Sequence, residues 1–499
     1  MSATTSSRPA RISDPAGALC TGAATALVSA AAVCFFLAKD SILAFGDAES
    51  HLNIARRVFD SRTPGFEQLG SPWLPLPQVL MLPLVGNMTM WQTGMAGSIP
   101  SGLCFAAAAA FLYATAFHVF KSRAAAATAA ALFVLNPNVL YLQAIPMTES
   151  AFFAALLGLL YFTVRYADDP GWHSAAGAGA MALATTLTRY EGWFLLPFSA
   201  AFVLLTGGKR RIALTALFSL IAIAGPLFWL GYNHWYFGDA LYFYRGPYSA
   251  KAIQGGQPYP GKGDWIVATY YFATAAKLVV GAPLFWMGLA GAISGCTKRA
   301  IWPVALLSLP PVFYIWSMHS SGTPIYIPVL APFTWYNSRY GLAALPLLAF
   351  ACAGLFNNRL ALALLIPIAI GPWLLHPHMA NWVTWKESQV NNSARMAWTH
   401  EGAAYFRANL GQGDTIFTNT SDITGIYREA GIPLRKTLTV DNGPYWAAAI
   451  VRPEIFARDH WAVASSGDAV EKAVARVPAY VLVKEFAVKS AAPIRIYHQ

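Results

Sequence analysis

Charged residues are scarce in this chain: Asp, Glu, Lys and Arg make up 11% of its 499 residues, against about 25% in an ordinary soluble domain. Hydrophobic residues make up 56%, and the mean hydropathy is +0.44. A soluble core has no room for so much apolar sequence, so the composition excludes an ordinary soluble protein. A bilayer accommodates it, because a spanning helix of about 20 apolar residues satisfies its own backbone hydrogen bonds.

Cysteine is also rare, and all five cysteines lie in or beside long apolar runs. They are Cys20, Cys34, Cys104, Cys296 and Cys352. The polar connections and the polar C-terminal segment contain none, so we expect no structural disulfide there, although a compartment outside the cytoplasm would permit one.

About eleven apolar runs follow one another along the chain, and ten to twelve spans is the range that they allow. The runs lie near residues 17–38, 93–118, 124–141, 150–166, 174–188, 192–207, 211–230, 276–295, 301–318, 339–356 and 359–375. The first is long for a signal peptide and leads directly into charged sequence, so we interpret it as a retained helix.

Lysine and arginine mark every second turn between these runs. The basic turns are short and contain Lys121, Arg123, Arg165, Lys209, Arg210, Arg211, Lys298, Arg299 and Arg359. Because such residues stay in cytoplasmic loops, this pattern predicts an inside N-terminus and places the other connections on the outer face. Those connections are 39–92, 142–149, 188–191, 231–275, 319–338 and the tail from about 376. The net charge of +11 is therefore mostly a topology signal, and no nucleic-acid partner is expected.

Two carboxylates and an imidazole, Asp47, Glu49 and His51, directly follow the first apolar run. Such groups suit a general base, metal ligands or acceptors for a substrate hydroxyl, although acids also favour helix starts. Arg56 and Arg57 follow in an amphipathic stretch, where they would contact either lipid phosphates or a substrate phosphate.

The later outer connections carry further ionisable residues. Glu149 begins an apolar helix, where a carboxylate is costly without a partner or a water-filled cavity, although it also complements the helix dipole. Arg189 and Glu191 lie in a short outer turn, which favours an anionic ligand or a salt-bridged loop. Two more outer sites combine aromatic and basic residues: Tyr242 with Lys251, and Arg339 with Tyr340. This combination suits a sugar phosphate, although a membrane-anchoring aromatic belt also explains the aromatics.

With these residues in place, the chain resembles the GT-C superfamily of membrane glycosyltransferases, particularly the branch of protein O-mannosyltransferases and lipid A aminoarabinose transferases. The resemblance rests on five motifs in order: GDAESH with Asp47 and Glu49, Pro146 to Glu149, TRYEGW, FGDALYFY and NSRYGLAALP. It departs from the mannosyltransferases in having Ala48 between the two acids, which leaves open which acid is catalytic. The Trp-Trp-Asp signature of oligosaccharyltransferases is absent.

The resemblance implies that a sugar moves from a polyprenyl-phosphate carrier to an acceptor hydroxyl at the outer face, with inversion. By position, Asp47 would be the base, with Glu49 and Glu149 as further catalytic candidates. Five cations would bind the donor phosphate: Arg189, Arg339, Arg56, Arg57 and Lys251. Four residues would contact substrate: His51, Glu191, Tyr242 and Tyr340. The sugar, the acceptor and any need for a divalent metal ion stay open, and a bacterial inner membrane is the expected location.

From about Met379 the sequence becomes polar. Short apolar strands at Thr415–Thr418, Trp461–Ala464 and Tyr480–Val483 alternate with helical stretches at Glu401–Leu410 and Ala469–Arg476. This alternation predicts a small α/β domain on the outer side. The expected fold is thus an all-α polytopic membrane domain over residues 1–378, whose first outer loop covers about 45–92, followed by an α/β domain over residues 379–499.

Two other functions are compatible with many spans and outer charges: a transporter or flippase for lipid-linked sugars, and a protein that binds lipid carriers without turnover. Transporters more often show inverted repeats and interrupted mid-membrane helices. No repeat is visible here, and the charges gather in loops at one face, which favours the transferase.

Overall fold

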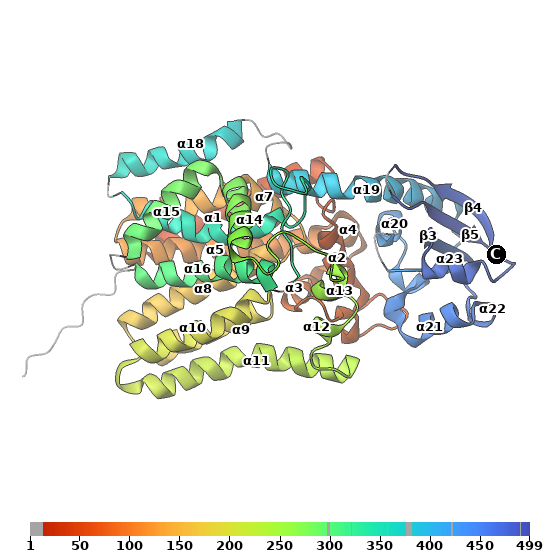
Figure 1. Ribbon diagram of the computed structural model, residues 1–499, viewed down its shortest axis with the longest axis horizontal. Coiled ribbons are helices and arrows are strands. Elements are labelled where there is room, and N and C mark those ends of the chain that lie inside the picture. Colours follow the sequence, from red (N-terminus) through yellow and green to blue (C-terminus); the bar gives the residue numbers. More distant parts are fainter. Residues whose placement is uncertain are drawn as a thin grey trace, which may run out of the picture.

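The computed structural model describes residues 13–296, 300–320, 322–356, 358–375, 382–420, 423–489 and 491–499. A bundle of helices occupies one end of the long axis, and a small α/β domain occupies the other (Figure 1). Short helices of the connecting loops lie between the two.

Five helices among the described residues are long and apolar enough to cross a membrane. They are α1 (Pro15–Ala38), α5 (Met95–Phe120), α8 (Glu149–Asp168), α11 (Arg211–Phe237) and α16 (Ile301–Ser320). Two bent pairs raise the number to as many as seven: α6 (Arg123–Val134) with α7 (Pro137–Ala144), bent by 64°, and α14 (Trp265–Val280) with α15 (Ala282–Cys296), bent by 116°. The chain is therefore an integral membrane protein by the length and apolar character of its helices.

Shorter helices complete the bundle. They are α3 (Leu76–Val85), α9 (Trp172–Thr186), α10 (Glu191–Thr206), α17 (Leu345–Ala353), preceded by the 3-10 helix η3 (Ser338–Ala344), and α18 (Arg359–Leu375). All eleven predicted apolar runs are helical, and two of them, 124–141 and 276–295, are interrupted by a bend. Pro137 lacks an N–H and begins a new helix capped by Asn136, and Gly281 takes a φ of +91° between α14 and α15.

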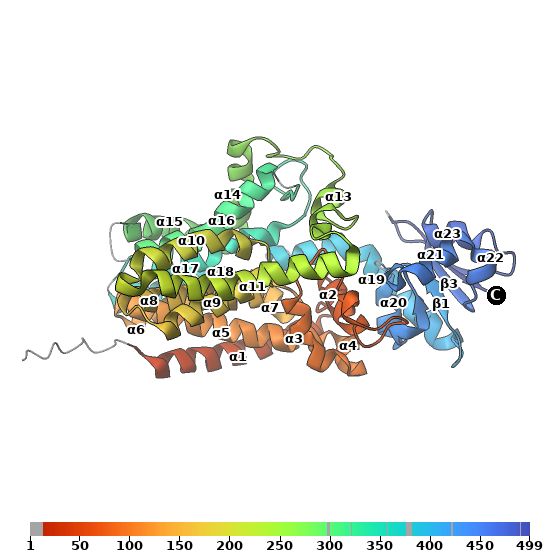
Figure 2. The ribbon, with the colours of Figure 1, turned by 90° about the horizontal axis from the view of Figure 1, so that it is seen from below.

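The connections that the sequence places on one face lie at one end of the bundle, next to the α/β domain (Figures 1 and 2). They form short elements there: α2 (Gly46–Arg57), η1 (Phe66–Leu69), α4 (Met88–Thr93), α12 (Tyr242–Arg245) and α13 (Ala250–Gln254). The basic turn at η2 (Gly208–Arg210) directly precedes α11 and lies at the opposite end of that helix from α12. The shared end agrees with the predicted topology, while the side of the membrane on which it lies stays a prediction.

A mixed five-stranded sheet forms the centre of the C-terminal domain, with strand order β2-β1-β3-β5-β4. The strands are β1 (Ile416–Thr418), β2 (Thr437–Leu438), β3 (Trp461–Ser465), β4 (Val481–Phe486) and β5 (Ile494–His498). Strand β1 is parallel to β2 and β3, and β5 is antiparallel to β3 and β4. The sequence predicted β1, β3 and β4 but neither β2, which has two residues, nor β5.

Helices and 3-10 turns connect these strands. They are α20 (Thr424–Ala430), η5 (Leu434–Lys436), η6 (Val440–Asn442), α21 (Pro444–Val451), α22 (Pro453–Phe456) and α23 (Ala469–Val474). The predicted α/β class of the domain is confirmed.

One helix, α19 (Val383–Asn409), belongs to both regions. At its start, Trp385 packs against Phe36 of α1 with ring centroids 5.2 Å apart, and toward its end Phe406 is buried in the core of the C-terminal domain. The sequence predicted only the last third of this helix, because many polar residues in the first two thirds interrupt the pattern of apolar residues expected for an amphipathic helix. The predicted boundary at Met379 lies outside the described residues.

Glu49 of α2 anchors the bundle to this domain. Its carboxylate accepts hydrogen bonds from Arg395 Nη1 of α19 and from Arg428 Nε of α20, the latter at 2.7 Å. Arg395 also donates to the carbonyl oxygens of Leu43 and Ala44 at 2.8 and 2.9 Å. Since Glu49 is only 5% exposed, these two arginines depend on its charge for their burial.

We expect Glu49→Gln to lower the free energy of unfolding by about 3–5 kcal/mol, because it leaves two buried arginines without their counter-charge. Thermal unfolding of the purified protein measures the loss. Glu485→Gln is the control: Glu485 pairs with Arg495 at 2.6 Å on the surface, where a pair contributes about 0–1 kcal/mol. Equal effects of both substitutions would contradict the anchoring role.

Candidate active site

Helix α2 carries the residues that define the candidate site. Its acids lie in the first turn and Arg56 and Arg57 in the last, which is the arrangement that the helix dipole favours. Asp47 and His51 are four residues apart and so share one side of the helix, whereas Glu49 points elsewhere. The two acids of the GDAESH motif consequently have different surroundings.

Asp47 contacts the bundle through Arg339 of η3. Arg339 Nη2 donates to Asp47 Oδ2 at 2.5 Å, and the Asp47 side chain remains 37% exposed. Desolvation is the largest single influence and opposes the ionised form, but the charge and hydrogen bond of Arg339 together with the other nearby charges outweigh it and lower the pKa of Asp47. Asp47 Oδ1 has no hydrogen bond to any described residue. Asp47 is thus an ionised, fixed carboxylate with one oxygen open to a ligand.

Glu149, the first residue of α8, lies between the two predicted phosphate-binding arginines. Its Oε1 is 3.4 Å from Arg339 Nε and 3.2 Å from Arg189 Nη1. Its Oε2 is buried without a hydrogen-bond partner among the described residues. A buried carboxylate oxygen without a partner is expensive, so this atom is a second place where a ligand would donate a hydrogen bond.

Arg189 is held by neighbours on every side. Its Nε donates to Glu191 Oε1 at 2.7 Å, its Nη1 to Thr148 Oγ1 at 2.5 Å, and its Nη2 to the Tyr314 hydroxyl, which itself donates to Glu191. This turn is therefore a salt-bridged loop, one of the two alternatives that the sequence allowed.

Tyr340 lies beneath both arginines. Its ring centroid is 5.5 Å from the guanidinium carbon of Arg189 and 5.3 Å from that of Arg339. The same ring stacks on Tyr314 at 4.5 Å. These cation–π contacts fix the two guanidinium groups side by side.

His51 is buried one turn after Asp47. The side-chain amide of Gln78 lies 2.8 Å from His51 Nδ1. In the orientation that satisfies both ends of this amide, the Gln78 nitrogen donates to the carbonyls of Leu74 and Pro75, and the Gln78 oxygen accepts a hydrogen bond from His51 Nδ1. The imidazole also packs on Trp73 with ring centroids 4.4 Å apart. Burial lowers the pKa of His51 from the usual 6.5 to about 4, so this side chain is neutral at neutral pH.

Glu387 of α19 is a site residue that the sequence analysis missed. It accepts hydrogen bonds from the backbone N of Ser338, at 3.0 Å, and from the Ser338 hydroxyl. Burial raises the pKa of Glu387. By holding Ser338, this carboxyl fixes the backbone next to Arg339. The only signal in the sequence was a single acid beside the tryptophans at the start of a polar segment.

Besides Glu49, four predicted residues lie away from this cluster. Arg56 bonds Asp60 and the carbonyls of Val85 and Gly86 at 2.7–2.8 Å. Lys251 is exposed over the ring of Tyr244, and Tyr242 stacks on Phe237. None of these three contacts the Asp47 cluster in the described part of the chain.

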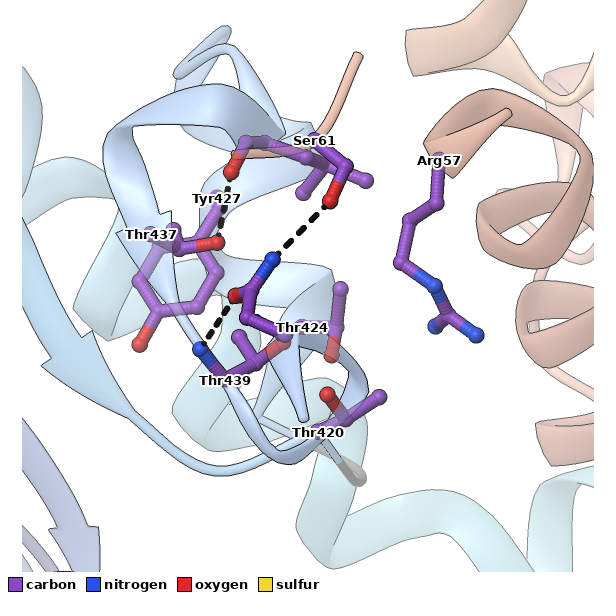
Figure 3. A pocket seen from close by; sticks show the side chains of 9 residues that line it. Arg57, Ser61, Thr420, Thr424, Tyr427, Thr437 and Thr439 are labelled. Carbon is purple, nitrogen blue, oxygen red and sulfur yellow. Dashed lines mark hydrogen bonds between the residues drawn. The ribbon is translucent and has the colours of Figure 1, made fainter. Parts of the chain in front are cut away.

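Arg57 faces the C-terminal domain instead. It is 3.2 Å from Asp441, and its Nε has no partner among the described residues. Figure 3 shows it across a small pocket from Thr420, Thr424, Thr437 and Thr439. The cavity of about 10 Å³ has room for about one water molecule, so it is too small for a phosphate.

No three His, Cys, Asp or Glu side chains converge on a possible metal position within the described ranges. The acids of the cluster are instead paired with arginines and tyrosines. Glu149 Oε2 and Asp47 Oδ1 are oxygens of the kind that a hard divalent cation prefers, and a metal requirement stays open.

Comparisons with known proteins give a partial family match and a shared fold. Residues 73–230 match the family described as dolichyl-phosphate-mannose-protein mannosyltransferase. The sequence matches no curated protein. Among solved structures, ArnT from Cupriavidus metallidurans in the apo state is 14% identical, with a TM-score of 0.56 over 94% of this chain and 97% of that chain. The oligosaccharyltransferase of Archaeoglobus fulgidus is 14% identical, with a TM-score of 0.48 over 90% and 69%.

The likeness to ArnT covers nearly the whole of both chains, including the C-terminal domain. At this identity it establishes a common fold and no more. It confirms the predicted arrangement of a helical membrane region followed by a small α/β domain.

The lowered pKa of His51 predicts how the stability of the folded protein changes with pH. Because its pKa is lower in the folded protein than in the unfolded chain, the unfolded chain gains a proton between pH 6.5 and about 4 that the folded protein does not. Stability therefore falls as the pH drops through this window, by about 3 kcal/mol in all. We expect thermal unfolding midpoints of His51→Gln to fall less steeply over this window than those of the unsubstituted protein. Parallel curves would show that His51 binds a proton equally in both states.

Proposed function

We propose that this chain, a membrane protein with the GT-C fold, is a glycosyltransferase that moves a sugar from a polyprenyl-phosphate carrier to an acceptor hydroxyl at the outer face of the membrane. The match to a mannosyltransferase family over residues 73–230 supports a glycosyl donor of this class. The cluster around Asp47 supplies the chemistry.

The observation that carries the proposal is the state of the Asp47 carboxylate. Arg339 holds one oxygen and keeps the group ionised, while the other oxygen is open in a side chain that is 37% exposed. A general base needs this combination: a fixed position, the deprotonated form and access to a substrate proton. Glu49 has both oxygens bound by arginines, which favours Asp47 as the base and gives Glu49 a positioning role.

In the proposed reaction, Asp47 Oδ1 accepts the proton of the acceptor hydroxyl as its oxygen attacks the anomeric carbon. The bond from that carbon to the phosphate oxygen breaks, and its electron pair leaves with the polyprenyl phosphate. Attack opposite the leaving group inverts the anomeric centre. Glu149 Oε2, which is buried and without a partner, would accept a hydrogen bond from a second substrate hydroxyl.

Arg339 is the better candidate for the leaving phosphate. Its Nη2 donates to Asp47, whereas Nε, 3.4 Å from Glu149 Oε1, and Nη1 have no hydrogen bond to a described residue. A fixed cation with an open donor stabilises charge that develops in the transition state. The Arg189 guanidinium donates hydrogen bonds to Thr148, Glu149, Glu191 and Tyr314. We therefore propose that Arg189 positions Glu149 and Tyr340. It would contact the phosphate only after these hydrogen bonds rearrange.

Asp47→Asn tests the base. The amide keeps the shape and an oxygen for Arg339 but accepts no proton, so turnover should fall by about 10² to 10⁴ while donor binding persists. The measurement is sugar transfer, or release of polyprenyl phosphate, from a panel of polyprenyl-phosphate sugars. Asp239→Asn, in an exposed pair with Arg245, is the control. Near-normal turnover of Asp47→Asn together with loss in Glu149→Gln would move the base to Glu149.

Arg339→Ala tests the phosphate contact. Losing one charge-assisted hydrogen bond should weaken use of the donor by about 1.5–3 kcal/mol, measured as kcat/KM for the donor. Arg245→Ala removes an arginine with a 62% exposed side chain near the same end of the bundle and should change little. If Arg189→Ala loses donor use and Arg339→Ala does not, the phosphate lies at Arg189.

A further inference from the structure

A second cavity lies on the far side of α2 from the Asp47 cluster. It has a volume of about 240 Å³, opens to the surface, and is lined by residues of the end of α1, the connection to α2, α2 itself, α4, α19 and α20. Figure 2 shows these elements meeting where the bundle joins the C-terminal domain. The volume is below the roughly 300–1,000 Å³ of pockets for drug-sized ligands, so it suits a small polar group rather than a glycan.

The inner wall of this cavity offers hydrogen-bond donors. Arg428 is 7% exposed, and its Nε and Nη1 are bound by Glu49 and the Gln92 carbonyl, whereas Nη2 has no hydrogen bond to a described residue. Thr399 is 3% exposed, and its hydroxyl has no partner in the described part of the chain. A buried guanidinium and a buried hydroxyl with open valences point to an absent acceptor, such as a phosphate oxygen.

The outer rim has the opposite charge. Asp40 and Glu429 lie on either side of His400, whose Nε2 is 3.2 Å from Asp40 and whose Nδ1 is 2.9 Å from Glu429. The Asp40 side chain is 76% exposed. Asp40 approaches His400 through Oδ2 only, and its exposed side chain leaves its other oxygen open, so the rim has a position for a further cationic hydrogen-bond donor.

The remaining wall is apolar and continues into the membrane span. Leu37, in the last turn of α1, lines the cavity together with Ile42, Leu43 and Met396. Leu37 is 43% exposed, and Leu19 and Leu27 of the same helix are more exposed still. The cavity therefore lies at the end of an exposed apolar helix, at the level where lipid headgroups meet the protein.

We infer that this cavity binds the headgroup of a bilayer phospholipid that carries a primary amine. The phosphate contacts Arg428 and Thr399, the ammonium contacts Asp40 and Glu429, and the acyl chains run along α1 past Leu37. Because Arg428 also binds Glu49 of α2, an occupied site braces the helix that carries Asp47. This inference does not depend on the proposed reaction.

The test compares headgroups on the full-length protein. Native mass spectrometry of protein released from vesicles with equal parts phosphatidylethanolamine and phosphatidylcholine should show about tenfold preferential retention of the ethanolamine lipid, the effect of one charge-assisted hydrogen bond that a trimethylammonium group does not make. The double substitution Asp40→Asn with Glu429→Gln should abolish the preference. Asn suits the positive φ of residue 40, +48°, so the backbone is unchanged.

Two controls separate the parts of the inference. Asp239→Asn removes another surface carboxylate and should keep the preference. Thr399→Val should reduce retention of both lipids without changing their ratio. Equal retention of the two lipids by the unsubstituted protein would overturn the inference, as would a preference that survives in the double variant.

Discussion

Buried charge holds helix α2 on two sides, and the site depends on this double attachment. Glu49 binds Arg395 and Arg428 of the C-terminal region, and Asp47 binds Arg339 of the bundle. In a medium of low dielectric constant, an unpaired charge costs several kcal/mol, so each pair fixes the position of its partner. The α2 helix is therefore placed by two regions of the chain at once. A change in how the domain docks would move Asp47 relative to Arg339 and Glu149.

The same rule explains why the cluster is rigid and yet reactive. Arg189 and Arg339 lie among Glu149, Glu191 and Asp47, with Tyr340 beneath both guanidinium groups. The donors of Arg189 are occupied, and Arg339 is fixed by its hydrogen bond to Asp47 and its contact with Tyr340. Among the atoms left open are Asp47 Oδ1, Glu149 Oε2 and Arg339 Nη1, which the proposed reaction uses for the acceptor proton, a sugar hydroxyl and the leaving phosphate. Rigid partners with a few open valences are what electrostatic preorganisation requires.

Single residues show where sequence reasoning succeeded and where it stopped. Asp47, Glu149, Arg189 and Arg339 could be grouped beforehand, because alternating spans put their loops on one face and an ionisable residue at a span end needs a partner. Arg56 shows the limit: its position in an amphipathic stretch indicated a phosphate ligand, but it bonds Asp60 and the Val85 and Gly86 carbonyls. Glu387, Arg395 and Arg428 were missed, because their partners lie 49 to 379 residues away along the chain.

The sequence by itself determined the membrane class, the helical runs, the shared end of the acidic and basic loops and the α/β class of the C-terminal domain. These follow from hydrophobic period and from charge, which act over one turn or one span. The tertiary structure alone decided which acid of Asp47 and Glu49 faces the bundle, that α19 joins the two regions and that Arg57 faces the domain. These features depend on which charged residues, far apart in the chain, form buried ion pairs, and local sequence patterns do not specify such long-range contacts.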